Sequence, residues 1–124
     1  MKHALLVFLG GGFGSLLRFV ISKFLNPQFQ NFFLGTFLVN VLGCLLIGVI
    51  LGLSERGNLF SLNTSLFLAT GFCGGFTTFS AFAFEQHTFL KNGELFNFSF
   101  YTISSLVLGV LAVSLGFWLT RLGN

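Results

Sequence analysis

The hydrophobic positions of this chain form four long runs that are separated by short polar clusters. The runs cover residues 4–24, 32–53, 63–90 and 97–120 of a single predicted domain, 1–124. A helix that crosses the apolar part of a bilayer needs about 20 mostly apolar residues, which each run supplies. The pattern therefore predicts an all-α protein with four transmembrane helices, in which neighbouring helices run antiparallel because the connections are short.

The third run is interrupted near its middle, at residues 74–78. Gly74 and Gly75 are followed by Thr77 and Thr78, and Gly and β-branched Thr are both poor helix formers. A broken helix at membrane depth is tolerated only where protein or water pairs the freed backbone groups. Ion and substrate sites are often built at such breaks. The segment therefore predicts a small membrane protein that handles ions.

Composition agrees with a membrane protein. The chain is 54% hydrophobic and only 7% charged, whereas a soluble domain carries charge on roughly a quarter of its residues. The lipid bilayer is thus the expected surrounding. Pairs of glycines four residues apart predict close helix packing, and they are Gly10 and Gly14, Gly48 and Gly52, and Gly71 and Gly75.

Basic residues near helix ends orient a membrane protein, and here they are almost balanced. Lys2, Arg56 and Arg121 lie on the side of the N-terminus, Lys23 and Lys91 lie on the opposite side, and Arg18 lies one turn inside that second end. Either other factors fix a weak orientation, or copies insert both ways and pair antiparallel. Four short helices make a poor pore alone, so we expect an oligomer.

In an antiparallel pair, features near the membrane midplane meet their own copy at the two-fold axis. Thr77 lies about 21 Å along the third run at 1.5 Å per residue, close to mid-depth. Two broken helices that cross there would offer backbone carbonyls to one monovalent cation. The alternative interpretation is a simple kink that eases packing.

Polar side chains and aromatic rings in the runs form a sparse track. Its members are Thr36 and Asn40 on one helix face, Phe79, Ser80 and Phe82 after the break with Glu85 or Gln86 beyond them, and Tyr101 and Ser105 in the fourth run. The track is either a permeation lining or a set of helix-to-helix hydrogen bonds. Donor groups and the positive edges of Phe rings suit a small anion. Arg18 either raises the anion concentration at a pore mouth or anchors its helix at the interface.

The run interiors hold no Asp or Glu, because Glu85 is expected near a helix end. This argues against the alternative function, a proton-coupled small multidrug exporter of similar size and topology, and against a cation channel with an acidic ring. An enzyme is not expected either. Cys44 and Cys73 lie inside runs without metal-ligand spacing, and the glycines of residues 10–14 do not match a phosphate loop.

Three motifs in order resemble the Fluc (CrcB) fluoride channel family over the whole chain. They are Gly10-Gly11-x-x-Gly14-x-x-x-Arg18, Gly35-Thr36-Phe37-Leu38-Val39-Asn40-Val41-x-Gly43, and Gly71 to Phe82. The resemblance implies a dual-topology antiparallel homodimer in the cell inner (plasma) membrane, with passive efflux of fluoride from the cytoplasm that lowers its toxicity. No nucleic acid is an expected partner.

The resemblance also implies roles for individual residues. Asn40, Phe79, Phe82 and Ser80 match pore positions, and Tyr101 and Ser105 match polar positions of the fourth helix, with Thr36 on the Asn40 face and Arg18 in the vestibule. A structural sodium ion at the dimer centre would be held by the backbone carbonyls of Gly74 and Thr77.

Overall fold

A computed structural model describes residues 1–28, 33–56 and 61–122 of the chain. Four helical segments in it are long and apolar enough to cross a membrane, so the predicted fold class is confirmed. They are α1 (Lys2–Leu25), α2 (Leu34–Glu55), a composite third segment (Leu62–Lys91) and α6 (Leu95–Leu119), and a short 3₁₀ turn, η1 (Asn26–Gln28), follows α1. The second run was expected to begin at residue 32, which lies outside the described residues.

The composite third segment has four parts, namely α3 (Leu62–Ser65), the π-helix η2 (Leu66–Cys73), α4 (Gly74–Phe76) and α5 (Phe79–Lys91). The residues between α4 and α5 are extended, with ψ of 158° at Thr77 and 120° at Thr78. The break is thus narrower than the expected 74–78, because both glycines are helical. The π-helix was not predicted. The wide turns of a π-helix are frequently found at functional sites.

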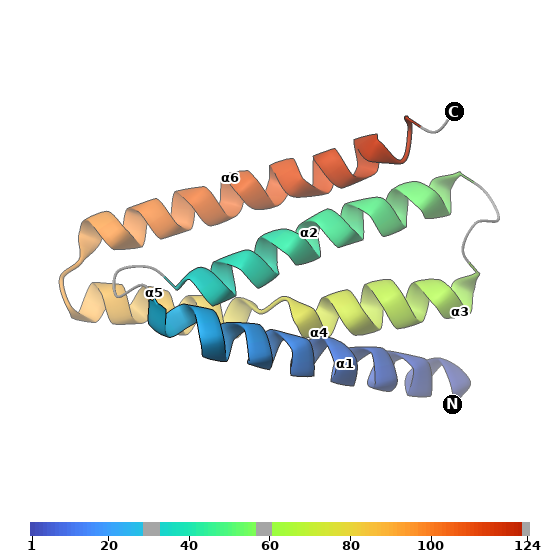
Figure 1. Cartoon of the computed structure of the whole chain (residues 1–124), viewed down its shortest axis with the longest axis horizontal. Helices are drawn as coiled ribbons and strands as arrows, with labels where there is room; N and C mark the ends of the chain where they lie inside the picture. Colours follow the sequence, from blue (N-terminus) through green and yellow to red (C-terminus); the bar gives the residue numbers. More distant parts are fainter. Residues whose placement is uncertain (29–32, 57–60, 123–124) are drawn as a thin grey trace.

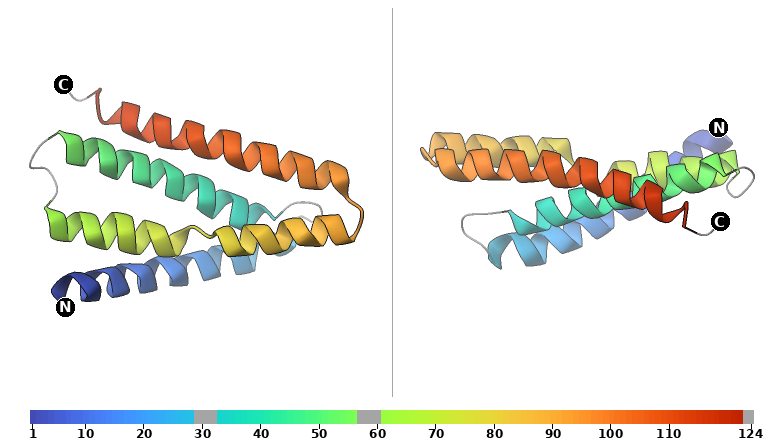
Figure 2. Two further views of the ribbon diagram at one scale, coloured as in Figure 1. Left: turned by 180° about the vertical axis from the view of Figure 1, so that it is seen from behind. Right: turned by 90° about the horizontal axis from the view of Figure 1, so that it is seen from above.

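The four segments run alternately up and down, so both termini lie at the same end of the molecule (Figure 1). The α2 helix packs mainly on α6, and α1 packs on η2 and α4. Seen from above, α5 lies beside the first half of α6, and these two diverge from α1 and α2 (Figure 2). The broken segment is therefore held on one side by α1 and on the other by α2 and α6.

Local sequence explains where the helices end. Pro27 lies two residues after the end of α1, within η1, and cannot continue an α-helix without losing a hydrogen bond. At the end of α5, Gly93 adopts φ of +73°, a conformation that a residue with a side chain rarely adopts. The Glu94 amide then donates to the Phe89 carbonyl at 2.8 Å, which closes the helix end in the way common for C-terminal glycines.

The predicted glycine pairs bring helices together within one chain. A Cβ atom on Gly14 would lie 2.2 Å from the Phe72 carbonyl oxygen, and one on Gly48 would lie 2.2 Å from that of Val113. Both neighbours are backbone atoms and cannot move aside. Close packing of this kind is what small residues provide in membranes, where no hydrophobic effect drives helices together.

The outer surface is that of a multi-pass membrane protein. Only 11% of the most apolar window of α1 and of α6 is buried inside the chain. Large apolar side chains such as Phe8 and Phe96 are 74% and 78% exposed. Such a surface is compatible with lipid, since a soluble monomer rarely exposes large continuous apolar patches.

Candidate functional site

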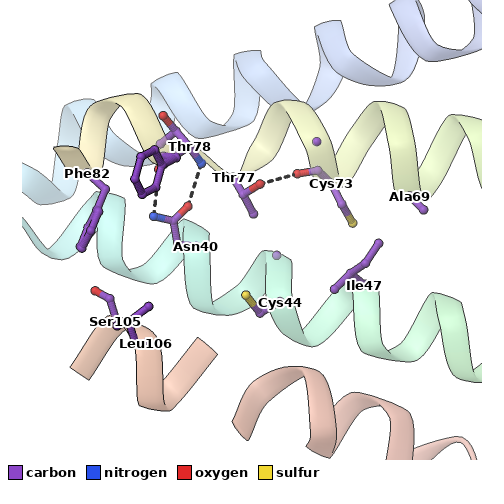
Figure 3. A pocket seen from close by; sticks show the side chains of 13 residues that line it. Asn40, Cys44, Ile47, Ala69, Cys73, Thr77, Thr78, Phe82, Ser105 and Leu106 are labelled. Atoms are coloured by element: carbon purple, nitrogen blue, oxygen red, sulfur yellow. Dashed lines mark hydrogen bonds between the residues drawn. The ribbon is translucent and has the colours of Figure 1, made fainter. Parts of the chain in front are cut away.

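The break in the third segment is bridged by the side chain of Asn40 from α2. The Thr78 amide donates to Asn40 Oδ1 at 2.7 Å, and Asn40 Nδ2 donates to the Thr78 carbonyl at 3.1 Å (Figure 3). The carboxamide thus pairs both backbone groups of one extended residue, as a neighbouring strand would. This pairing is what makes an extended residue tolerable inside a membrane.

Threonine hydroxyls form hydrogen bonds with backbone groups at the two helix ends that meet at the break. Thr77 Oγ1 donates to the Cys73 carbonyl at 2.9 Å, and Thr78 Oγ1 accepts the Ala81 amide at 3.1 Å. The second bond is an N-cap, which satisfies one of the free amides at the start of α5. The C-terminal end of α4 carries a negative partial charge and the N-terminal end of α5 a positive one, and both ends lie at the break.

Arg18 lies against the break from the side of α1. Its Nε donates to the Gly75 carbonyl at 3.0 Å, and Ser15 Oγ approaches the same oxygen at 3.5 Å. The sequence suggests two alternative roles for Arg18, a positive charge at a pore mouth or an anchor of its helix at the membrane interface. A contact with the backbone of the broken helix was not foreseen.

An open groove of about 480 Å³ runs along the break between α2, α6 and the third segment. Six of the predicted site residues line it, namely Asn40, Gly74, Thr77, Phe79, Phe82 and Ser105. Its remaining lining is mostly small or apolar and includes the free thiols of Cys44 and Cys73. Within the described part of the chain, the buried Oγ of Ser105 has no hydrogen-bond partner.

A second polar cluster is buried at the far side of Phe82. Glu85 is 6% exposed and accepts hydrogen bonds from Thr36 Oγ1 at 2.6 Å and from the Tyr101 hydroxyl at 2.7 Å. Asn26 supports Thr36, since its Oδ1 accepts the Thr36 amide at 3.1 Å and its Nδ2 donates to Oγ1 at 3.3 Å. The predicted residues Thr36 and Tyr101 thus meet around a carboxylate.

The expectation for Glu85 was wrong in one respect. It is expected near a helix end, whereas it lies at the middle of α5 and is buried between α2 and α6. A buried carboxylate is costly unless donors compensate it, and the two hydroxyls do so. The available signal was spacing, because Phe82 and Glu85 are three residues apart and share a helix face. The donors come from other helices and could not be assigned from the sequence.

Phe82 joins the groove to the buried cluster. Its ring centroid lies 4.9 Å from that of Tyr101 and 6.1 Å from that of Phe79. Phe79 is 78% exposed on the isolated chain, although it lies within a membrane span. Ser80 is also exposed, and its Oγ lies 3.3 Å from Thr78 Oγ1, outside the groove lining.

Four antiparallel spanning helices, with a broken third helix beside a groove that holds both polar groups and aromatic rings, define a small membrane protein of the ion-handling class. The sequence matches the family described as CrcB-like protein, Camphor Resistance (CrcB), over residues 5–117. The chain belongs to this family, and the resemblance seen in its motifs is confirmed.

Three relatives carry the name fluoride-specific ion channel FluC. The protein of Phocaeicola vulgatus is 48% identical over 122 residues, which cover 98% of this chain and 100% of the relative. That of Gloeothece citriformis is 44% identical over 124 residues, with 99% and 100% covered. That of Prosthecochloris aestuarii is 49% identical over 117 residues, with 94% and 91% covered.

Proposed function

We propose that this protein is a fluoride channel through which fluoride leaves the cytoplasm passively. The observation that carries the proposal is sequence identity of 44–49% along nearly the whole chain to proteins named fluoride-specific ion channels. Those names describe channels and not enzymes, and they do not support a multidrug exporter. Hydrofluoric acid is a weak acid that crosses membranes neutral and ionises inside the cell. The trapped anion leaves down its gradient once a path exists.

The groove and the cluster beyond it offer the donors that such a path requires. Fluoride is small and strongly hydrated, so a pore must replace lost water with hydrogen-bond donors. The Asn40 amide nitrogen carries two N–H groups, of which one is donated to Thr78. The N-terminal end of α5 adds a positive partial charge. The rims of the Phe79 and Phe82 rings attract an anion without a formal charge, which leaves it weakly enough bound to move on.

In the inner part of the path, Glu85 occupies two hydrogen-bond donors that fluoride would use. The hydroxyls of Thr36 and Tyr101 both donate to its carboxylate. A fluoride ion beyond Phe82 gains these two donors only when the Glu85 carboxylate turns away. Ser105 is a further hydrogen-bond donor for fluoride on the groove side, since its buried hydroxyl has no partner within the described ranges.

We also propose that two copies assemble antiparallel, with dual topology. One wall of the groove is open on a single chain, and Phe79 is exposed within a membrane span. A Cβ atom on Gly74 would meet no atom within 4 Å, so another chain can approach there. The near balance of basic residues at the two membrane faces favours insertion in both orientations.

The residues at the break fit a structural sodium ion at the centre of that dimer. In an unbroken helix the Gly74 carbonyl would accept the Thr78 amide, which donates to Asn40 instead. The Thr77 carbonyl would accept the Ala81 amide, which donates to Thr78 Oγ1 instead. Backbone oxygens of this kind replace the water of a monovalent cation. A sodium ion would offset the dipoles of these carbonyls and link the two chains.

The test is fluoride efflux from liposomes that contain the purified protein, followed with a fluoride electrode. A potassium ionophore prevents charge from building up. We expect rapid fluoride release and little release from matched vesicles loaded with chloride. A proton gradient imposed without a fluoride gradient should drive no more fluoride uptake than it does in protein-free vesicles. Fluoride release no faster than from protein-free vesicles would overturn the proposal.

A further inference from the structure

The contact between Arg18 and the broken helix has no role in the path described above. Arg18 lies with Gly11 and Ser15 on one face of α1, at spacings of three and four residues. All three meet Gly75. A Cβ atom on Gly75 would lie 2.4 Å from the Gly11 carbonyl oxygen and 3.0 Å from Ser15 Oγ. The α1 helix therefore touches the backbone of the break directly.

The pairing of carbonyls around the break shows what Arg18 does there. In an unbroken helix the Gly75 carbonyl would accept the Phe79 amide, but Thr77 and Thr78 are extended. Arg18 Nε supplies the missing donor at 3.0 Å. Hydrogen bonds from a guanidinium are shorter and about twice as strong as neutral ones. The orientation of this peptide group is thereby fixed from outside its own helix.

We propose that Arg18 is a positioning residue that engages the Gly75 carbonyl and so reserves the carbonyls of Gly74 and Thr77 for a cation. This inference rests on the sodium site proposed above. It assigns the function of Arg18 to its Nε–H donor. The alternative, attraction of anions to a pore mouth, assigns it to the positive charge.

Three variants separate the donor from the charge. In Arg18→Gln the amide nitrogen is bonded to Cδ, as Nε is in arginine, so the donor stays in place and the charge is lost. In Arg18→Met a methyl group occupies this position, and both donor and charge are lost. In Arg18→Lys the charge stays, but the donor is one bond further out. All four side chains have similar helix propensities.

The readout is the melting temperature of the purified protein as a function of sodium concentration, with potassium replacing sodium at constant ionic strength. We expect Arg18→Met to need about tenfold more sodium for half of the stabilisation, the factor that corresponds to one charged hydrogen bond. Arg18→Gln should stay within about threefold of the parent, since a neutral bond remains. Fluoride flux at saturating sodium should recover in Arg18→Met.

The control is Arg121→Met, which removes an exposed arginine that pairs with Glu55 at 3.3 Å, far from the break. It should leave the sodium dependence unchanged. An unchanged sodium midpoint in Arg18→Met would overturn the inference. So would a sodium midpoint raised about tenfold in Arg18→Gln together with a parent-like midpoint in Arg18→Lys. This pair of variants decides the case if Arg18→Met does not fold. A parent protein that does not respond to sodium would remove the sodium site itself, and the inference with it.

Discussion

Replacement of Asn40 by Asp tests the link between the break and the anion path. The Asn40 carboxamide gives one hydrogen bond to the Thr78 carbonyl at 3.1 Å and receives one from the Thr78 amide at 2.7 Å. An ionised Asp is close to the same size and can still accept from the amide. It cannot donate, so it sets a negatively charged oxygen against the carbonyl oxygen.

Two costs follow from this geometry. An unpaired buried carbonyl costs about 1–3 kcal/mol. A carboxylate near the middle of a membrane helix adds about 2.5–3.5 kcal/mol on insertion scales. Both act on the open groove where fluoride would pass, and the charge also repels the anion. Fluoride itself loses an Asn40 N–H donor, and a hydrogen bond to a charged group contributes about 1.5–3 kcal/mol. Since each 1.4 kcal/mol of added barrier is a factor of ten, we expect fluoride flux to fall about a hundredfold.

The assay is fluoride efflux from liposomes at neutral pH, with the amount of incorporated protein matched between variants. Gel filtration in detergent shows whether Asn40→Asp still assembles like the parent. The matched control is Asn63→Asp in α3, the same substitution at the start of the third segment, in a different span and outside the groove. It should conduct normally.

Normal flux through Asn40→Asp would refute the reasoning, because a charged acceptor would then be harmless at the proposed pore. A loss of flux in Asn63→Asp as large as that in Asn40→Asp would also count against it. In that case any new carboxylate in the third segment or its neighbours would inactivate the protein.

The remaining predictions concern the rings, the topology and the cation. Phe79→Ile and Phe82→Ile should each lower flux about tenfold, which is the upper range of an aromatic edge contact. Phe96→Ile, which removes a ring on α6 as exposed as that of Phe79, should have no effect. A cysteine introduced as Asn92→Cys, in the turn after α5, should react with an impermeant reagent from both sides of the membrane, about half of the molecules from each. Removal of sodium should lower the melting temperature of the protein and its fluoride flux.

Each of these has a contradicting outcome. Parent-like conduction in both phenylalanine variants would move the path to another helix face. Labelling of the added cysteine from one side only would exclude dual topology. A third helix whose carbonyls were all paired, in an experimental structure of the assembly, would end the sodium proposal.

Local sequence was sufficient to predict the membrane architecture. In lipid every backbone group must find a partner within the protein, so long apolar runs can only be helices or closed barrels. The same constraint indicated the break. The middle of the third apolar run contains four poor helix formers within five positions, Gly74, Gly75, Thr77 and Thr78. The family motifs then indicated which ion to expect.

Tertiary structure alone decided how the break is held and where the charges lie. Asn40 pairs with Thr78, 38 positions away, and Arg18 reaches Gly75, 57 positions away. Thr36 from α2 and Tyr101 from α6 donate hydrogen bonds to Glu85 on α5. Helical periodicity shows which residues share a face, but not which face of another helix it meets. In a membrane these contacts depend on close packing and hydrogen bonding between helices, and both are properties of the assembled fold.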